Sequence, residues 1–122
     1  MATVLVIDDD RHMRAACGRA LAKAGWLVVS AETGDEGIER LKRPGQKFDA
    51  VLLDQLMPGI TGTEALAQIR AIDPNLPVVI MTGSITDDDA KAIKRQGAFD
   101  CLPKPFTPDQ LREMIKKAAG KT

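Results

Sequence analysis

Five short apolar segments recur along the 122-residue chain, separated by longer segments with a different pattern. They are residues 4–7, 27–29, 51–53, 78–81 and 99–102. The first four are rich in Val, Ile and Leu and do not alternate with polar residues, which is typical of strands buried on both faces of a parallel sheet. The pattern therefore predicts five short strands, of which the first four lie in the interior.

The segments between these runs carry apolar side chains at the three- and four-residue spacing of helices with one buried face. The stripes are Met13, Cys17, Ala20, Leu21 and Ala24; Ile38 and Leu41; Ala65, Leu66, Ile69 and Ile72; Ala90 and Ile93; and Leu111, Met114, Ile115 and Ala118. Strand and helix are thus predicted to alternate five times.

Residues at the ends of these stripes agree with the helices. Thr33, Thr61 and Thr107 are each followed three positions later by Glu or Gln, which is the spacing of a capping box. Glycines fall just after three stripes, where helices commonly end; they are Gly25, Gly97 and Gly120. The alternation predicts an α/β fold, with a mainly parallel sheet, helices on both faces and right-handed crossovers. No linker or low-complexity stretch divides the sequence, so residues 1–122 are expected to form one domain.

Charged and hydroxyl side chains follow the predicted strands where each one ends. Acidic residues 8–10 follow the first strand, Asp54 the third, Thr82 the fourth and Lys104 the fifth. Ligands of an open parallel sheet bind beyond the carboxyl ends of its strands, so these side chains are expected to converge. Crowded carboxylates raise one another's pKa and destabilise the fold unless a cation neutralises them. Mg²⁺, which prefers carboxylate, water and phosphate oxygens, is the expected ion, with Lys104 as a second neutralising charge.

The composition argues against several other chemistries. Seventeen basic residues balance seventeen acidic ones, so no net charge attracts nucleic acid or an anionic membrane. One histidine and two widely separated cysteines do not make a zinc or redox motif, and four aromatic residues are too few for a base-stacking surface. The apolar runs are too short to cross a bilayer and the N-terminus does not resemble a signal peptide, so a cytoplasmic location is expected.

Five stretches in this order resemble the receiver domain of two-component response regulators. They are VLVIDDD (4–10), DQLMPG (54–59), VIMTG (79–83), GAFD (97–100) and LPKPF (102–106). The resemblance covers almost the whole chain. It implies a flavodoxin-like fold with the strand order 2-1-3-4-5.

The resemblance also implies a reaction. Asp54 would be the nucleophile that takes a phosphoryl group from a phosphohistidine on a sensor histidine kinase or a histidine phosphotransfer protein. Lys104 would pair with the phosphoryl oxygens and Thr82 would donate its hydroxyl to them. The chain would accept and slowly lose this group by its own chemistry, as a phosphoprotein in a phosphorelay, without being an enzyme.

The same resemblance implies the metal ligands. Asp9 and Asp54 would bind Mg²⁺ directly, Asp8 would hold a metal-bound water, and the main-chain carbonyl of Leu56 would complete the set. Leu56 and Ser84 would occupy positions at which the family tunes dephosphorylation.

Two further features concern the segment around the predicted fifth strand. The peptide bond between Lys104 and Pro105 would be cis. Signalling would proceed through a conformational change around the fourth helix and the fifth strand, yet Cys101 stands where the family usually has Tyr or Phe. The usual aromatic switch is therefore missing.

Other interpretations remain open from the residues alone. Asp10 fits the N-cap of the first helix, acidic residues 87–89 fit an exposed helix start, His12 fits a surface residue and Cys17 a core residue.

A small aspartate-nucleophile phosphatase would use Asp8, although the chain has no room for the cap such enzymes carry. A flavodoxin-like carrier would need a phosphate-binding loop after the first strand, where acidic residues stand. A pseudo-receiver that binds partners without phosphorylation would normally have lost one of the acids or the lysine.

Overall fold

Strands and helices alternate along the chain as the apolar pattern predicts. The computed structural model describes residues 2–83 and 85–120. The strands and helices follow in the order β1 (Thr3–Ile7), α1 (Arg11–Lys23), β2 (Leu27–Ala31), α2 (Gly34–Lys42), β3 (Ala50–Asp54), α3 (Gly62–Ile72), β4 (Val78–Thr82), α4 (Asp87–Arg95), β5 (Asp100–Pro103) and α5 (Pro108–Ala118). In this described part, no helix combines the length and the apolar character needed to cross a membrane.

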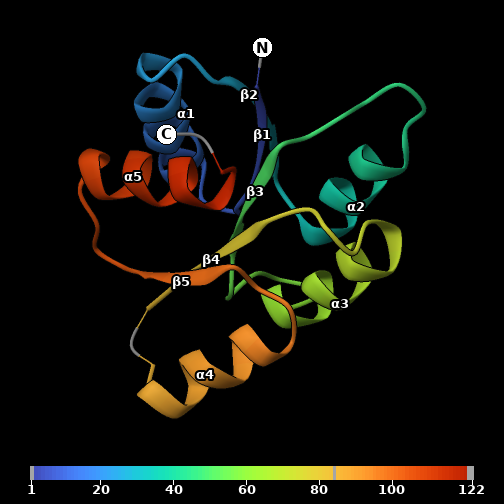
Figure 1. Cartoon of the computed structure of the whole chain (residues 1–122), viewed down its shortest axis with the longest axis vertical. Helices are drawn as coiled ribbons and strands as arrows, with labels where there is room; N and C mark the ends of the chain where they lie inside the picture. The colour runs from blue at the N-terminus through green and yellow to red at the C-terminus, as the bar shows by residue number, and fades with distance from the viewer. Residues whose placement is uncertain (1, 84, 121–122) are drawn as a thin grey trace.

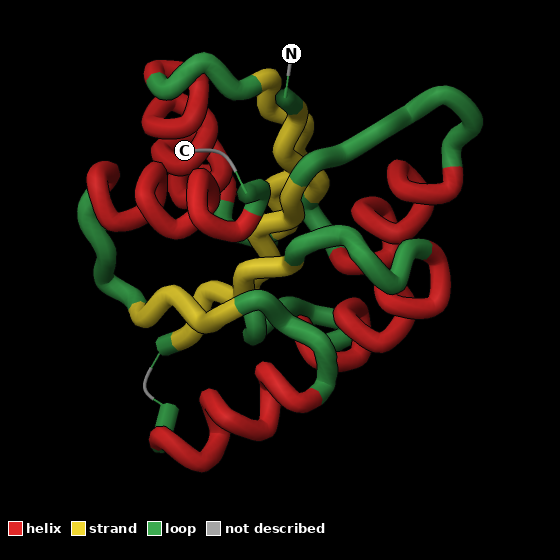
Figure 2. Tube along the Cα trace, in the orientation of Figure 1, coloured by secondary structure: helices red, strands yellow, loops and turns green. Residues whose placement is uncertain are grey.

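The five strands form one parallel sheet in the order β2-β1-β3-β4-β5, which confirms the predicted topology. Figure 1 shows α1 and α5 on one face of this sheet and α2, α3 and α4 on the other. In Figure 2 the strands run through the middle of the molecule between these two helical layers. All strand ends that precede a helix therefore meet along one edge.

The core consists of two apolar layers, one on each face of the sheet. Leu5 and Ile7 of β1 belong to the layer that also contains residues of α2, α3 and α4, whereas Val4 and Val6 belong to the layer that contains residues of α1 and α5. Strands β1, β3 and β4 are buried along nearly their whole length, because helices cover both faces. This burial explains why their sequences are continuously apolar.

The prediction that the second strand is buried on both faces is wrong. Leu27 and Ser30 of β2 are exposed, and Val28 and Val29 are only partly buried. The reason is the strand order, which places β2 at an edge of the sheet, where the helical layers end.

Hydrogen bonds at the helix starts follow the predicted caps with one difference. The boxes at Thr61 and Thr107 are complete. At Thr33 the hydroxyl accepts the N–H of Glu36 at 3.0 Å, but the Glu36 carboxylate accepts the N–H of Glu32 instead of that of Thr33. The helix α2 thus has half of the predicted box.

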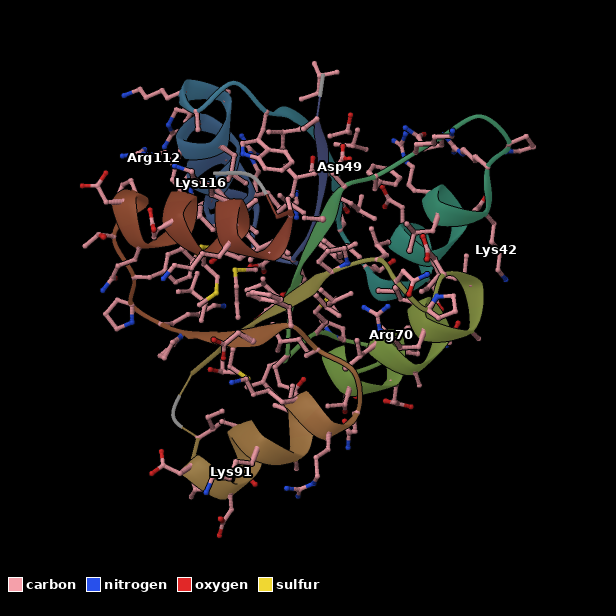
Figure 3. All side chains as sticks on the ribbon, viewed as in Figure 1. Lys42, Asp49, Arg70, Lys91, Arg112 and Lys116 are labelled. Atoms are coloured by element: carbon pink, nitrogen blue, oxygen red, sulfur yellow. The ribbon has the colours of Figure 1, made fainter. Side chains whose placement is uncertain are left out.

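Arg70 of α3 joins the loops at the opposite end of the sheet from the acidic residues. Its guanidinium donates to the carbonyls of Gly97 at 3.1 Å, Asp73 at 2.9 Å and also Leu76. Arg70 lies beside α3 and near the chain entering β5 in Figure 3, whereas Lys91 of α4 points into solvent. Arg70 thus links the loops at this end of the sheet, away from the carboxyl ends of the strands.

Candidate functional site

Three carboxylates meet at the carboxyl ends of β1 and β3. Asp8 follows β1 and Asp54 ends β3, and both are buried, while Asp9 is exposed. One carboxylate oxygen from each lies within 4.8 Å of the others. The convergence expected from the sequence is therefore present, because parallel neighbouring strands bring their ends to the same edge.

The fourth acidic residue of this region, Asp10, caps the start of α1 and does not join the carboxylate cluster. Its Oδ1 accepts the N–H of His12 at 2.8 Å and that of Met13 at 3.4 Å, so Asp10 is the N-cap of α1. This confirms the capping interpretation. His12 is exposed and Cys17 is buried in the core, as expected.

Burial dominates the electrostatics of Asp8. Burial is the main reason why the pKa of this carboxyl rises from its ordinary 3.8 to about 6; the Asp10 N–H lowers this pKa and the nearby charge of Asp54 raises it. That N–H donates to Asp8 Oδ1 at 2.9 Å. The other oxygen, Oδ2, has no hydrogen-bond partner among residues 2–83 and 85–120. A buried carboxylate oxygen without a partner is costly and marks a place for a cation or a donor.

Lys104 supplies the positive charge at this edge. Its Nζ lies 3.0 Å from Asp54 Oδ1 and 3.9 Å from Asp8 Oδ2. Its own N–H donates to the carbonyl of Thr82 at 2.6 Å, which fixes the chain after β5 against the end of β4. The following peptide bond, Lys104–Pro105, is cis, as the resemblance implies.

Thr82, the last residue of β4, contributes a buried hydroxyl. Within the described ranges its Oγ1 has no hydrogen-bond partner. Leu56 lies two residues beyond Asp54, and its side chain is 75% exposed. Ser84 lies outside the described residues. Three buried side-chain atoms thus lack a hydrogen-bond partner among the described residues: Asp8 Oδ2, Gln55 Oε1 and Thr82 Oγ1.

Gly62, at the start of α3, holds the backbone that follows Asp54. Its N–H donates to the carbonyl of Gln55 at 2.9 Å. A Cβ at this position would lie 2.7 Å from the Asp54 carbonyl oxygen and 2.7 Å from Gln55 Cα. Only glycine allows α3 to approach this closely. The sequence interpretation did not include this residue, because capping patterns do not report contact with a distant strand end.

Arg14 is a second residue that the sequence interpretation missed. Its Nη1 donates to the main-chain carbonyl of Asp8 at 2.8 Å. The signal in the sequence was a basic residue four positions after the N-cap Asp10, a spacing that turns its side chain back toward the loop.

The site fits a hard divalent cation. Three carboxylates beside the ammonium of Lys104 carry an excess of negative charge, and one of them, Asp8, has an oxygen without a hydrogen-bond partner among the described residues. Mg²⁺ binds through one or two carboxylates together with water and phosphate oxygens, which suits this donor set.

A surface pocket of about 640 Å³ lies away from this site. It is lined by residues such as Trp26, Arg112 and Lys116, at the side of α5 where Figure 3 labels the two basic residues. None of the converging side chains lines it. The converging side chains therefore lie at an open edge of the sheet and not in this pocket.

Comparisons with known proteins identify relatives. A family model for the response regulator receiver domain matches residues 4–116. The DNA-binding transcriptional regulator NtrC of Escherichia coli K12 is 43% identical over 117 residues, which cover 94% of this chain and 24% of that protein. Transcription factor SKN7 of Chaetomium thermophilum is 31% identical over 114 residues, which cover 93% of this chain and 15% of that protein. The chain thus spans a quarter or less of the length of these relatives.

Solved structures agree with these sequence relatives. A response regulator receiver domain protein from Clostridium thermocellum has a TM-score of 0.91 and 32% identity, covering 98% of this chain and 95% of that one. A CheY-like receiver domain protein from Methanospirillum hungatei has a TM-score of 0.90 and 26% identity, covering 98% and 94%.

The raised pKa of Asp8 predicts a pH-dependent effect of Asp8→Asn on stability. In metal-free protein the folded state binds the proton of the Asp8 carboxyl more tightly than the unfolded state does. The stabilisation of the fold by this bound proton is complete below pH ~4 and is lost as the pH rises through about 6. Asparagine at position 8 does not ionise, so Asp8→Asn does not lose stability as the pH rises. At neutral pH the variant should be more stable than the wild type by roughly 1–3 kcal/mol, and the difference should approach zero near pH ~4.

Urea unfolding in EDTA across this pH range measures the difference. Asp88→Asn, which changes an exposed carboxyl in the first turn of α4, is the matched control and should not show this gain. A destabilised Asp8→Asn at neutral pH, or a gain that does not change with pH, would contradict the assignment.

Proposed function

This chain belongs to the response regulator receiver domain family, and on that premise we propose that Asp54 accepts a phosphoryl group from a phosphohistidine on a partner protein. The observation that supports this most is the position of Asp54. It ends β3 with its carboxylate buried, 3.0 Å from the ammonium of Lys104 and within 4.8 Å of Asp8 and Asp9. Phosphoryl transfer needs mainly positioning and neutralisation of charge, and these groups supply both.

The transfer exchanges one bond for another. A carboxylate oxygen of Asp54 attacks the phosphorus, an O–P bond forms, and the N–P bond of the phosphohistidine breaks with its electron pair remaining on the imidazole nitrogen. Lys104 holds the phosphoryl oxygens by charge, as its ammonium already lies on Asp54. The buried hydroxyl of Thr82, which lacks a partner among the described residues, donates to a phosphoryl oxygen once the group has arrived.

The metal site belongs to the same reaction. We assign Asp9 and Asp54 as direct ligands of Mg²⁺, Asp8 as the holder of a metal-bound water and the Leu56 carbonyl as a further ligand. When bound, Mg²⁺ neutralises the negative charge of the carboxylates and of the phosphoryl oxygens. The support from this structure is the cluster of three carboxylates with an unpaired buried oxygen.

The partners follow from this chemistry. The phosphoryl donor is a sensor histidine kinase or a histidine phosphotransfer protein. The product stays attached to Asp54 until it hydrolyses, so the chain acts as a phosphorylated signal carrier and not as an enzyme that turns over a substrate. The equal number of acidic and basic residues argues against direct binding of nucleic acid by this chain.

The output passes through α4 and β5. Among the described residues of α4, only Ile93 is buried, so this helix is held weakly enough to shift. Thr82 lies directly before the segment that leads into α4. Cys101 is buried in β5, and its side chain is too small to change the surface much by rotation. We therefore assign the signal to Thr82, the loop from Gly83 to Thr86 and α4, although Ser84 within that loop lies outside the described residues.

Asp54→Asn should abolish phosphorylation and leave the fold intact, because an amide and a carboxylate have similar shapes. The measurement is incubation with acetyl phosphate and Mg²⁺, followed by intact-mass and peptide mass spectrometry. Wild type and the exposed-carboxyl control Asp87→Asn should both be labelled, and EDTA should prevent labelling. Normal labelling of Asp54→Asn would refute the proposal, and a label on Asp8 would favour the phosphatase alternative.

The signalling route predicts that Cys101→Ser behaves like the wild type. Backbone amide chemical shifts with and without beryllofluoride, which mimics the phosphoryl group on aspartate, report the change. Both proteins should show the same shifts in α4, and Thr82→Ala should bind beryllofluoride but lose most of them. Loss of the α4 shifts in Cys101→Ser, with beryllofluoride still bound, would show that the thiol takes part.

A further inference from the structure

Arg14 reaches from the first turns of α1 to the backbone of the acidic edge. Its Nη1 donates to the carbonyl oxygen of Asp8 at 2.8 Å, and its side chain is only 15% exposed. Arg14 also donates its own N–H to the carbonyl of the N-cap Asp10 at 3.0 Å, so it lies one turn inside the helix. Because helical side chains lean toward the N-terminus, the guanidinium meets the peptide that links Asp8 to Asp9.

Arg14 holds the carbonyl of that peptide, whereas the other contacts of Asp8 hold its N–H and its side chain. The Asp8 N–H donates to the carbonyl of Ala31 at 3.2 Å, and Asp8 Oδ1 accepts the N–H of Asp10 at 2.9 Å. Asp9 is exposed, and one of its carboxylate oxygens lies within 4.8 Å of those of Asp8 and Asp54. The direction in which the Asp9 side chain leaves the backbone therefore depends on the peptide whose carbonyl Arg14 holds.

Glu32 contributes less to this arrangement. Its Oε1 lies 3.6 Å from Arg14 Nη2, but its side chain is 70% exposed. An ion pair with one well-solvated partner has a small effect on stability, whereas a hydrogen bond from a charged, largely buried donor is strong. The contact with the Asp8 carbonyl is thus the one that matters for the site.

We propose that Arg14 is a positioning residue for the metal site: it fixes the Asp8–Asp9 peptide so that the Asp9 carboxylate faces Asp54. This rests on the proposed function, because it names a residue that serves the same site. Arg14 touches neither the metal ligands' carboxylates nor the phosphoryl group in this account. Its contribution is to the geometry of the loop, as for residues outside the ligand sphere of other metal sites.

Charge and geometry predict opposite results when Arg14 is replaced. Arg14 brings a positive charge close to three carboxylates, so its removal by charge alone would strengthen the binding of a cation. If Arg14 positions the loop, its removal weakens binding in spite of that gain. The sign of the change in Mg²⁺ affinity therefore separates the two roles.

The experiment compares Arg14→Met with Arg11→Met in the unphosphorylated protein. Arg11 is exposed at the start of the same helix, so its replacement removes the same charge near the acids. Isothermal titration calorimetry with MgCl₂ gives the Kd. Arg14→Met should bind Mg²⁺ roughly tenfold more weakly than the wild type. Arg11→Met should bind it equally well or more tightly.

Two further variants test the contact itself. Arg14→Lys keeps a cationic donor for the Asp8 carbonyl and should restore the Kd to within about threefold of the wild type. Glu32→Gln, which removes only the exposed partner, should stay within about twofold. Arg14→Gln, whose shorter side chain loses the contact, replaces Arg14→Met in the comparison if that variant does not fold.

A second readout needs no metal. The ¹⁵N order parameter of the Asp9 amide in EDTA should fall in Arg14→Met and remain at the wild-type value in Arg14→Lys and Arg11→Met. Mg²⁺ binding by Arg14→Met as tight as that of the wild type, or an unchanged Asp9 order parameter, would overturn the positioning role. If the wild type binds no Mg²⁺, the proposed function fails, and the order parameter alone then decides whether Arg14 holds this peptide.

Discussion

Repulsion among the carboxylates of Asp8, Asp9 and Asp54 dominates the physical chemistry of this protein. Two of these carboxylates are buried, and the ammonium of Lys104 forms ion pairs with both of them. Burial and mutual charge raise the pKa of Asp8 to about 6, which is a direct sign that the folded state opposes its ionisation. The site therefore requires positive charge, and a divalent cation beside Lys104 would supply it before the negatively charged phosphoryl group arrives.

The core keeps these crowded carboxylates close together by holding the strand ends rigid. The apolar strands β1, β3 and β4 are buried between two helical layers, so their ends cannot move apart without disturbing the core. Gly62 lets α3 pack against the backbone after Asp54, and Lys104 is fixed through its N–H to Thr82. Arg14 extends the same principle to the loop that carries Asp9. Stability built in the core is thus used to hold like charges together at one edge.

The sequence predicts the strands and helices around this site and the residues at the strand ends, for identifiable reasons. Continuous apolar runs and capping residues locate the strands and helices, and parallel strands place Asp8, Asp54, Thr82 and Lys104 at one edge. The exposure of β2 is not visible in its own apolar pattern; it follows from the strand order that the resemblance implies, which places β2 at an edge of the sheet. The close approach at Gly62 and the contact of Arg14 with a carbonyl were also missed. Both depend on distances between segments that a linear pattern does not contain.

The effect of Mg²⁺ on thermal unfolding shows whether these crowded carboxylates bind a cation. Calorimetry of the wild type, Asp9→Asn and Asp8→Asn at neutral pH, with EDTA and then with millimolar Mg²⁺, gives the gain in Tm for each protein. Because a ligand that binds only the folded state stabilises it by mass action, the wild-type Tm should rise with Mg²⁺ concentration. The rise should largely disappear in Asp9→Asn and shrink less in Asp8→Asn. An equal rise in the wild type and Asp9→Asn would contradict the account.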